Sequence, residues 1–258
     1  MLYTYGAYLY IMFSSIARRS FANFYKKPVF LLMGAPGVGK GTYGKRLSAK
    51  YKMPIFSTGE YLRDLLKKKE KSPLIEKIRS IVLSGQLVDD ATILQIIDRR
   101  LFEDDAPGAK GIILDGFPRT VPQAESLDTR AKVNLVFNFY LADKILIEKM
   151  AGRRECEKCK MPYNVATIKK EGYDMDPLLP KKNIDFCDEC NGKLIQRKDD
   201  TEEVIADRLN VYKSKTEPLC EYYRKQGSMM EFEPKRGVND YPAIEKMVSD
   251  FIKERKLF

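Results

Sequence analysis

Residues 29–44, VFLLMGAPGVGKGTYG, constrain the fold more than any other part of this chain. The five consecutive apolar residues 29–33 predict a strand that is buried on both faces, as in parallel sheets. A glycine-rich turn and a helical pattern follow directly. Such a turn presents backbone N–H groups and the positive end of a helix to phosphate. The stretch therefore predicts a phosphate-binding loop in an α/β protein.

One position of this loop departs from the common form. That form is G-x-x-x-x-G-K-[ST], in which the hydroxyl after the lysine binds Mg²⁺. Gly34, Gly39 and Lys40 match it, but Gly41 follows the lysine and Thr42 comes one position late. The loop alone indicates a nucleotide-binding protein and does not identify the reaction. A tight strand–helix turn with an exposed lysine is the structural alternative.

Short apolar runs alternate with helical patterns after residue 27, which predicts a parallel sheet flanked by helices. Further strands are expected at 54–57, 111–114, 135–141 and 229–233, with Asp115 directly after the second of these. Apolar spacing predicts three helices between residues 61 and 101, and others at 40–50, 144–151, 202–224 and 243–253. The cysteine-rich sequence up to residue 200 is predicted to form loops.

The charge of the chain is concentrated near its N-terminus. The net charge is +10 over 258 residues, but the first 59 residues carry nine Lys and Arg and no Asp or Glu. This leaves 37 basic and 36 acidic residues in the rest, so bulk charge gives no case for nucleic-acid binding. The chain also lacks histidine, which excludes imidazole catalysis. Phosphoryl transfer remains possible without histidine, because it depends on positioning the reacting groups and on positive charge.

Residues 1–27 form a leader with an Arg pair, several serines and no acid. This composition is typical of an organellar transit peptide, for the mitochondrial or another organelle matrix. A secretory signal, a membrane anchor and an extension without an address, on a cytoplasmic protein, are the alternatives. The apolar run is shorter than the ~20 residues that a spanning helix needs, so stable membrane insertion is not expected.

Two cysteine pairs, Cys156-x-x-Cys159 and Cys187-x-x-Cys190, are separated by 27 residues. Paired knuckles of this kind predict a zinc site with four thiolate ligands. Such a site would be closed and structural. Two disulfides and four free thiols are the alternatives, and disulfides are disfavoured in a reducing compartment. Cys220 lies at an apolar spacing in the long helix and is expected to fill space.

Further motifs follow the loop in order: STGEYLR (57–63), GQLV (85–88), LDGFPRTVPQAE (114–125), GRR (152–154), QRKDD (196–200) and DRL (207–209). With GAPGVGKGT, this set resembles the adenylate kinase family, in its long form with a full-size lid, over about residues 28–258. GKGT combined with DGFPRT is highly specific for nucleoside monophosphate kinases. In that family Mg²⁺ is held chiefly through water and phosphates, so the resemblance explains why no hydroxyl is needed at position 41.

The resemblance implies a five-stranded parallel P-loop sheet flanked by helices, with two inserted parts. These are a helical acceptor-binding flap at 57–88 and a zinc-bearing lid at 152–200, within a kinase core of residues 28–258. It implies reversible phosphoryl transfer from Mg-ATP to AMP, giving two ADP, by a monomer that carries Mg²⁺ with the nucleotide and structural Zn²⁺. GTP as the donor, a catalytically silent nucleotide sensor or scaffold, and a zinc-ribbon nucleic-acid binder are the alternatives.

The resemblance also implies roles for individual residues. The residues that would bind the donor nucleotide are Gly34, Ala35, Pro36, Gly37, Val38, Gly39, Lys40, Gly41, Thr42, Lys149 and Arg153. Transfer falls to Lys40, Asp115, Arg119, Arg153, Arg197 and Arg208. AMP binding falls to Thr58, Arg63, Leu87, Val88, Gly116, Arg119, Gln123, Arg197 and Arg208. Chemistry supports the arginines independently, because planar guanidiniums bind phosphate oxygens bidentately.

The sequence departs from the family pattern on the donor side. Lys149 stands where the family usually has an arginine whose plane covers the donor base, and a lysine cannot stack in that way. GTYG replaces the commoner GTQA, and KRGVNDYP (235–242) does not align with the turn that touches the donor base. KKEGYDMDPLLPKK (169–182) lengthens the lid. ATP remains the default donor, and these departures leave GTP open as an alternative.

Overall fold

The computed structural model describes residues 24–67, 73–84, 86–102 and 108–258. Residues 1–23 of the leader, and residues 68–72 and 85 of the expected flap, lie outside this part of the chain. Within it, five strands form a parallel sheet in the order β10-β4-β1-β3-β2, which confirms the predicted fold class. The strands are β1 (Tyr25–Gly34), β2 (Ile55–Ser57), β3 (Ile112–Asp115), β4 (Ala131–Phe139) and β10 (Met229–Phe232).

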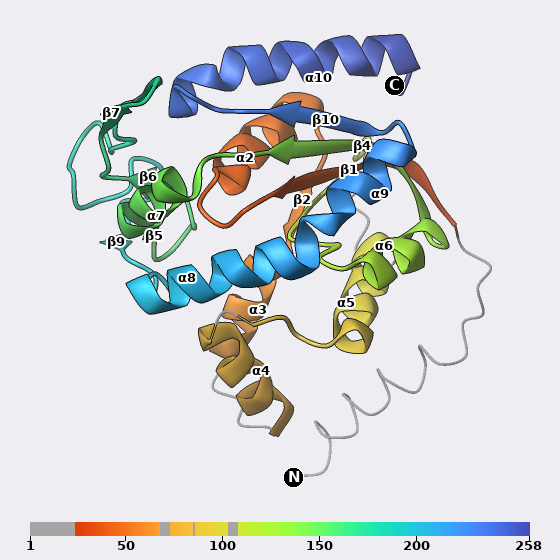
Figure 1. Cartoon of the computed structure of the whole chain (residues 1–258), viewed down its shortest axis with the longest axis horizontal. Coiled ribbons are helices and arrows are strands. Elements are labelled where there is room, and N and C mark those ends of the chain that lie inside the picture. Colours follow the sequence, from red (N-terminus) through yellow and green to blue (C-terminus); the bar gives the residue numbers. More distant parts are fainter. Residues whose placement is uncertain (1–23, 68–72, 85, 103–107) are drawn as a thin grey trace.

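The apolar run of β1 is buried because helices cover both faces of the sheet (Figure 1). Phe30 and Leu32 pack in one core cluster, whereas Leu31 and Met33 pack in the other, as the two-residue period of a strand requires. The first cluster includes side chains of α2 (Lys40–Tyr51), α7 (Asp143–Ala151) and α10 (Tyr241–Arg255). The second includes those of α5 (Asp90–Phe102), α6 (Val121–Asp128) and α9 (Pro218–Lys225).

Four strands end together at the phosphate loop. Asp115, the last residue of β3, pairs with Leu32 of β1 and with Ser57 of β2. Gly34, the last residue of β1, pairs with Phe139 of β4. Ligands of open parallel sheets bind at the carboxyl ends of the strands, so this edge is where a site is expected.

A pair of helices follows β2 and continues the second core. They are α3 (Thr58–Lys67) and α4 (Pro73–Leu83), which contribute the buried side chains Leu62 and Ile78. Figure 1 shows them below the sheet, next to the long helix that follows the cysteine-rich segment. They place the STGEYLR motif at the carboxyl edge of the sheet.

That long helix is interrupted, contrary to the single helix predicted over 202–224. Helix α8 (Glu202–Val211) runs into a π-helical turn, η1 (Tyr212–Thr216), before α9 begins at Pro218. Proline has no N–H to donate and its ring clashes with the preceding turn. The wider turn accommodates the proline, and it changes the direction of the chain between the two helices (Figure 1).

The cysteine-rich segment, predicted as loops, contains short strands instead. β5 (Arg153–Cys156), β6 (Pro162–Asn164) and β9 (Leu194–Ile195) form a three-stranded sheet. β7 (Ile168–Lys170) and β8 (Tyr173–Met175) form a separate antiparallel hairpin. The prediction was wrong because strands of two to four residues are too short for a two-residue period to be detected. A 3-10 turn, η2 (Gly237–Asp240), precedes α10.

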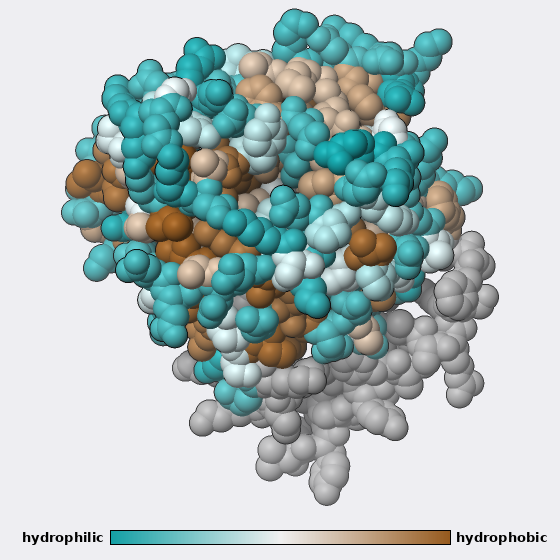
Figure 2. All heavy atoms as spheres, viewed as in Figure 1, coloured by the Kyte–Doolittle hydropathy of each residue, from teal (hydrophilic) through white to brown (hydrophobic). Residues whose placement is uncertain are grey.

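The surface is mostly hydrophilic on the face drawn in Figure 2, where hydrophobic residues appear as separate patches. No helix among the described residues combines the length and apolar character that crossing a bilayer requires.

Candidate active site

The phosphate loop connects β1 to α2 through backbone conformations that suit glycine. Gly34, Gly37 and Gly39 have φ of 129°, 86° and 113°, where a side chain is strained. A Cβ at Gly37 would also lie 2.5 Å from Cγ of Met150, because the loop rests against α7. The first turn of α2 carries no acidic side chain, and its N-cap forms no side-chain hydrogen bond. No carboxylate of this turn thus competes with an anion for the positive end of the helix.

Lys40 folds back over this loop. Its Nζ donates to the carbonyl oxygens of Gly34 at 2.6 Å and Ala35 at 2.9 Å. The pKa of Lys40 is lowered to about 8, chiefly by burial; the carboxylate of Asp115 acts in the opposite direction, and the charge of Arg119 contributes to the lowering. The ammonium therefore lies in a setting where an additional anion would strongly favour its charged form.

Three arginines from the second half of the chain are held by buried carboxylates. Nε of Arg153 donates to Oδ2 of Asp200 at 2.8 Å, and Nη1 of Arg208 donates to Oδ2 of Asp199 at 2.9 Å. Arg197 donates to Glu155. The three carboxylate residues are buried, with 4–7% of their surface exposed. These acids fix where the guanidinium groups point.

The arginines also perturb one another. The pKa of Arg208 is lowered to about 9, chiefly by burial and in part by the charge of Arg153. Burial lowers the pKa of Arg63, and the charge of Arg197 adds to this effect. Several positive charges therefore crowd one side of the cavity in excess of their carboxylate partners, which is the arrangement that binds phosphate.

Glu155, Asp199 and Asp200 did not appear among the predicted site residues. The signal for two of them was present, because QRKDD ends in the two aspartates. Burial alone would raise the pKa of Asp199, but Arg208 and Arg63 lower it below its usual range. A pair of acids beside an arginine-rich motif thus points to ion pairs within the site.

The other side of the cavity contains two buried polar side chains. Thr58 donates through Oγ1 to the carbonyl oxygen of Gly116 at 2.7 Å, and Nε of Arg119 donates to the same oxygen at 2.8 Å. The Gln123 amide accepts from the Arg119 N–H at 2.8 Å and donates to Oδ1 of Asp90 at 2.6 Å. These bonds hold the amide in one orientation.

Most of the predicted nucleotide residues line one cavity of about 230 Å³. These are Gly34, Pro36, Gly37, Gly39, Lys40, Gly41, Thr42, Arg63, Leu87, Asp115, Gly116, Arg119, Lys149, Arg153, Arg197 and Arg208. Thr58, Val88 and Gln123 line a smaller, adjoining cavity, which shares Arg63, Arg119 and Arg208 with the first. Ala35 and Val38 are buried within the loop. Residues from distant segments thus meet around one hollow.

The four predicted metal ligands also come together. The sulfurs of Cys156, Cys159, Cys187 and Cys190 all lie within 4.8 Å of one another. Four thiols at such spacing fit the tetrahedral geometry of zinc. Cys220 is partly buried and packs against the second core cluster, away from this group.

Comparisons with known proteins agree with one another. A family model described as adenylate kinase matches residues 32–228. The chain is 42% identical to "Adenylate kinase 1, chloroplastic" of Arabidopsis thaliana, over 81% of this chain and 73% of that protein. It is 39% identical to an adenylate kinase of Solanum tuberosum, over 88% and 79% of the two chains. It is 37% identical to a GTP:AMP phosphotransferase of Plasmodium falciparum, over 88% and 98%.

Proposed function

Because this chain belongs to the adenylate kinase family and is therefore a nucleoside monophosphate kinase, we propose that it transfers a phosphoryl group from Mg-ATP to AMP, reversibly, to give two ADP. The observation that supports this most is that a phosphate loop and arginines from five separate segments face one cavity. Two phosphate chains repel each other, and this convergence of fixed positive charge offsets that repulsion.

The reaction needs no protein nucleophile. An oxygen of the AMP phosphate attacks the terminal phosphorus of ATP, and the bond between that phosphorus and the bridging oxygen breaks to release ADP. Lys40 and the N–H groups of the loop hold the donor phosphates, and Arg119 and Arg63 hold the acceptor phosphate. Arg153, Arg197 and Arg208 stabilise the charge that develops on the transferring oxygens. Closure of these side chains around the group excludes water.

Mg²⁺ fits this site as part of the donor complex. Asp115 lies at the carboxyl end of β3 and acts on the charge of Lys40, so it would hold the water shell of the ion beside the donor phosphates. When bound, Mg²⁺ neutralises part of the phosphate charge. Thr42 lines the same cavity, one position after the place of the usual hydroxyl ligand.

Gln123 and Thr58 are the residues that we assign to adenine recognition in the acceptor site. An amide has two N–H donors and an oxygen with two lone pairs. Asp90 takes one donor and the Arg119 N–H takes one lone pair, so one donor and one lone pair stay free. Adenine presents a ring acceptor beside an exocyclic donor, which matches that free pair.

The two inserted parts close over the reactants in this proposal. We define the flap as residues 57–88 and the lid as residues 152–200, within a core of residues 28–258 that acts as a monomer. Zinc held by the four cysteines ties the lid, which buries only a small cluster of its own. The chloroplastic relatives and the acid-free leader favour an organelle matrix for this chain, mitochondrial or other.

A donor panel with AMP held fixed tests the function. ADP formation should be measured with ATP and with GTP, because one relative is a GTP:AMP phosphotransferase. ATP is the expected donor. Turnover with GTP alone would replace the donor and keep the reaction. Absence of turnover with both would favour a catalytically silent sensor.

Arg119→Ala tests the acceptor assignment. It removes a buried charge that faces the transferring group, so kcat/KM should fall about 10²- to 10³-fold while the melting temperature changes little. Arg224→Ala is the matched control, because Arg224 is exposed and pairs only at the surface with Glu221 and Glu231. Equal activity of the two variants would overturn the assignment.

A further inference from the structure

The sequence departures from the family pattern meet at one end of the large cavity. The Tyr43 hydroxyl donates to the carbonyl oxygen of Gly237 at 2.9 Å, and the Tyr43 ring stacks on Phe139 with centroids 4.9 Å apart. Nζ of Lys149 lies 3.7 Å from Sδ of Met175. Tyr43, Lys149, Met175 and Gly237 all line the cavity. The altered residues therefore form a connected group.

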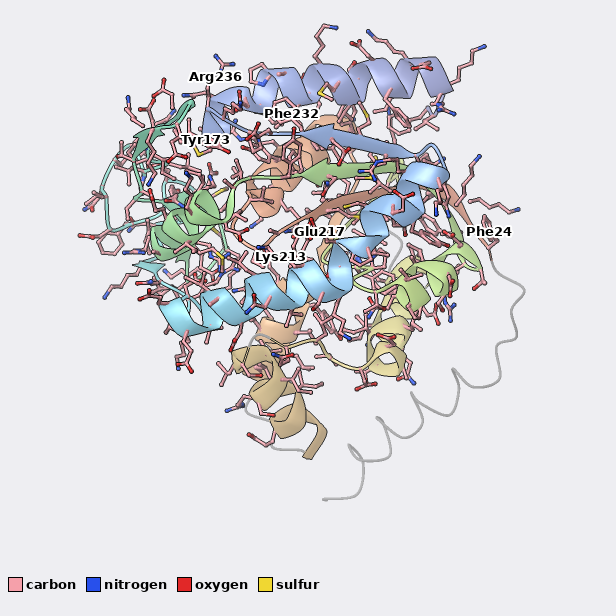
Figure 3. All side chains as sticks on the ribbon, viewed as in Figure 1. Phe24, Tyr173, Lys213, Glu217, Phe232 and Arg236 are labelled. Carbon is pink, nitrogen blue, oxygen red and sulfur yellow. The ribbon has the colours of Figure 1, made fainter. Side chains whose placement is uncertain are left out.

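The hairpin β7–β8 of the lid is docked on the core at this end. The Tyr173 hydroxyl donates to Oε1 of Glu233 at 2.6 Å, and the Asp174 N–H donates to the carbonyl oxygen of Lys235 at 2.9 Å. Tyr173 and Met175 are buried in the first core cluster. In Figure 3, Tyr173 lies toward the end of β10 where Phe232 is labelled. The hairpin thus joins the lid to the segment after β10.

This end of the cavity is where the base of the donor would lie. The phosphate loop lines this cavity, and Gln123 lines the adjoining cavity on the acceptor side, so the donor base is left with the lining that belongs to neither. The cavity is also lined by Lys149 of α7, by lid residues between 162 and 178, by residues 211, 212 and 216 around η1, and by η2. Several of these residues are apolar, namely Ala166, Ile168, Met175, Leu178 and Val238. Apolar walls suit the faces of a purine ring.

We propose that the β7–β8 hairpin forms a wall of the donor-base pocket and that Met175 packs against the purine of the donor triphosphate. The thioether is suited to this contact, since sulfur packs favourably against aromatic rings and the side chain adapts to their shape. Met175 is held between Lys149 and Gly237. The glycine lies so close that a Cβ at its position would be 3.5 Å from the Cβ of Met175. Met175 is thus a donor-binding residue supplied by the lid insertion, and this inference rests on the function proposed above.

Steady-state kinetics of Met175→Ala test this assignment. The KM for the donor triphosphate should rise about fivefold to tenfold, and the KM for AMP should stay within about twofold, since the contact concerns only the donor base. Met175→Leu restores most of the apolar volume and should recover most of the donor affinity. Direct titration of the enzyme with Mg-ATP, followed by calorimetry, should give the same change in Kd.

Met230→Ala is the matched control for general damage to the core. Met230 lies on β10 and packs against the same core cluster, but it is not part of the cavity lining. A donor KM that is unchanged in Met175→Ala, or raised equally in Met230→Ala, would overturn the proposal. If the unmodified enzyme forms no ADP with ATP or GTP, the proposed function fails instead, and titration with Mg-ATP still tests the contact.

Discussion

Asp200→Asn is the substitution with the most direct physical consequence. The side chain of Asp200 is fully buried, and it contacts Arg153 through Nε at 2.8 Å and lies 3.6 Å from Nη1 of Arg208. Asparagine has nearly the same shape, so the change removes one negative charge and little else. Two buried guanidinium groups then lose the carboxylate between them, which is costly in a low-dielectric interior.

The magnitude follows from the burial of this ion pair. Removing one partner of a buried pair typically costs about 3–5 kcal/mol in the free energy of unfolding. Asparagine keeps a hydrogen-bond acceptor for Arg153, so the lower end, about 3 kcal/mol, applies to Asp200→Asn. For a chain of this size, that free energy corresponds to a melting temperature lower by roughly 6–12 °C.

Differential scanning calorimetry without nucleotide is the assay, with Asp250→Asn as the control. Asp250 pairs with Lys246 at 2.6 Å on the exposed surface of α10, so its loss should leave the melting temperature nearly unchanged. Saturating Mg-ATP should reduce the deficit of Asp200→Asn, because phosphate returns negative charge to the same guanidinium groups. Equal melting temperatures for the two variants would refute the argument that Asp200 neutralises buried charge.

Two further outcomes concern protonation and metal. Burial lowers the pKa of Lys40 to about 8, and bound triphosphate should raise this pKa again. ATP binding should therefore take up protons at pH 8.5 and far fewer at pH 7, and the Lys40→Met variant should lose the uptake that comes from this group. Calorimetry in buffers of different ionisation enthalpy measures the proton uptake, and equal uptake at both pH values would contradict the prediction. Cys156→Ser should abolish bound zinc and lower the melting temperature by roughly 5 °C or more, whereas Cys220→Ser should keep the metal. Metal analysis that finds no zinc in freshly purified unmodified protein would refute the site.

The core strands and the phosphate loop were predictable because their signals are local. The run 29–33 and the glycines after it determine a buried strand and a turn without help from distant residues. The cluster of four cysteines was predictable for a similar reason, since two short cysteine knuckles can meet only if the chain between them folds back. Features that short segments determine in this way can be predicted from a single sequence.

The long-range contacts of the site were not predictable in the same way. Arg197 and Glu155 are 42 residues apart, and Tyr43 and Gly237 are 194 apart, so nothing in the sequence pairs them. The interruption of the helix after residue 211 had a signal that the apolar spacing concealed, namely Pro218 inside the predicted helix. Apolar spacing continues across a π turn with only a small shift, so it does not reveal the break.

The wide turn η1 (Tyr212–Thr216) separates a helix that lines the cavity from a helix that is anchored in the core. Before it, α8 carries Arg208 toward the cavity; after it, α9 is anchored in the core by Leu219 and Tyr223. Within the turn, the Thr216 hydroxyl donates to the carbonyl oxygen of Arg119 at 3.0 Å. The turn is therefore fastened to Arg119, and any movement of α8 relative to the turn would change the position of Arg208 relative to Arg119. The distance between the guanidinium groups of Arg208 and Arg119 would then report how far α8 has moved.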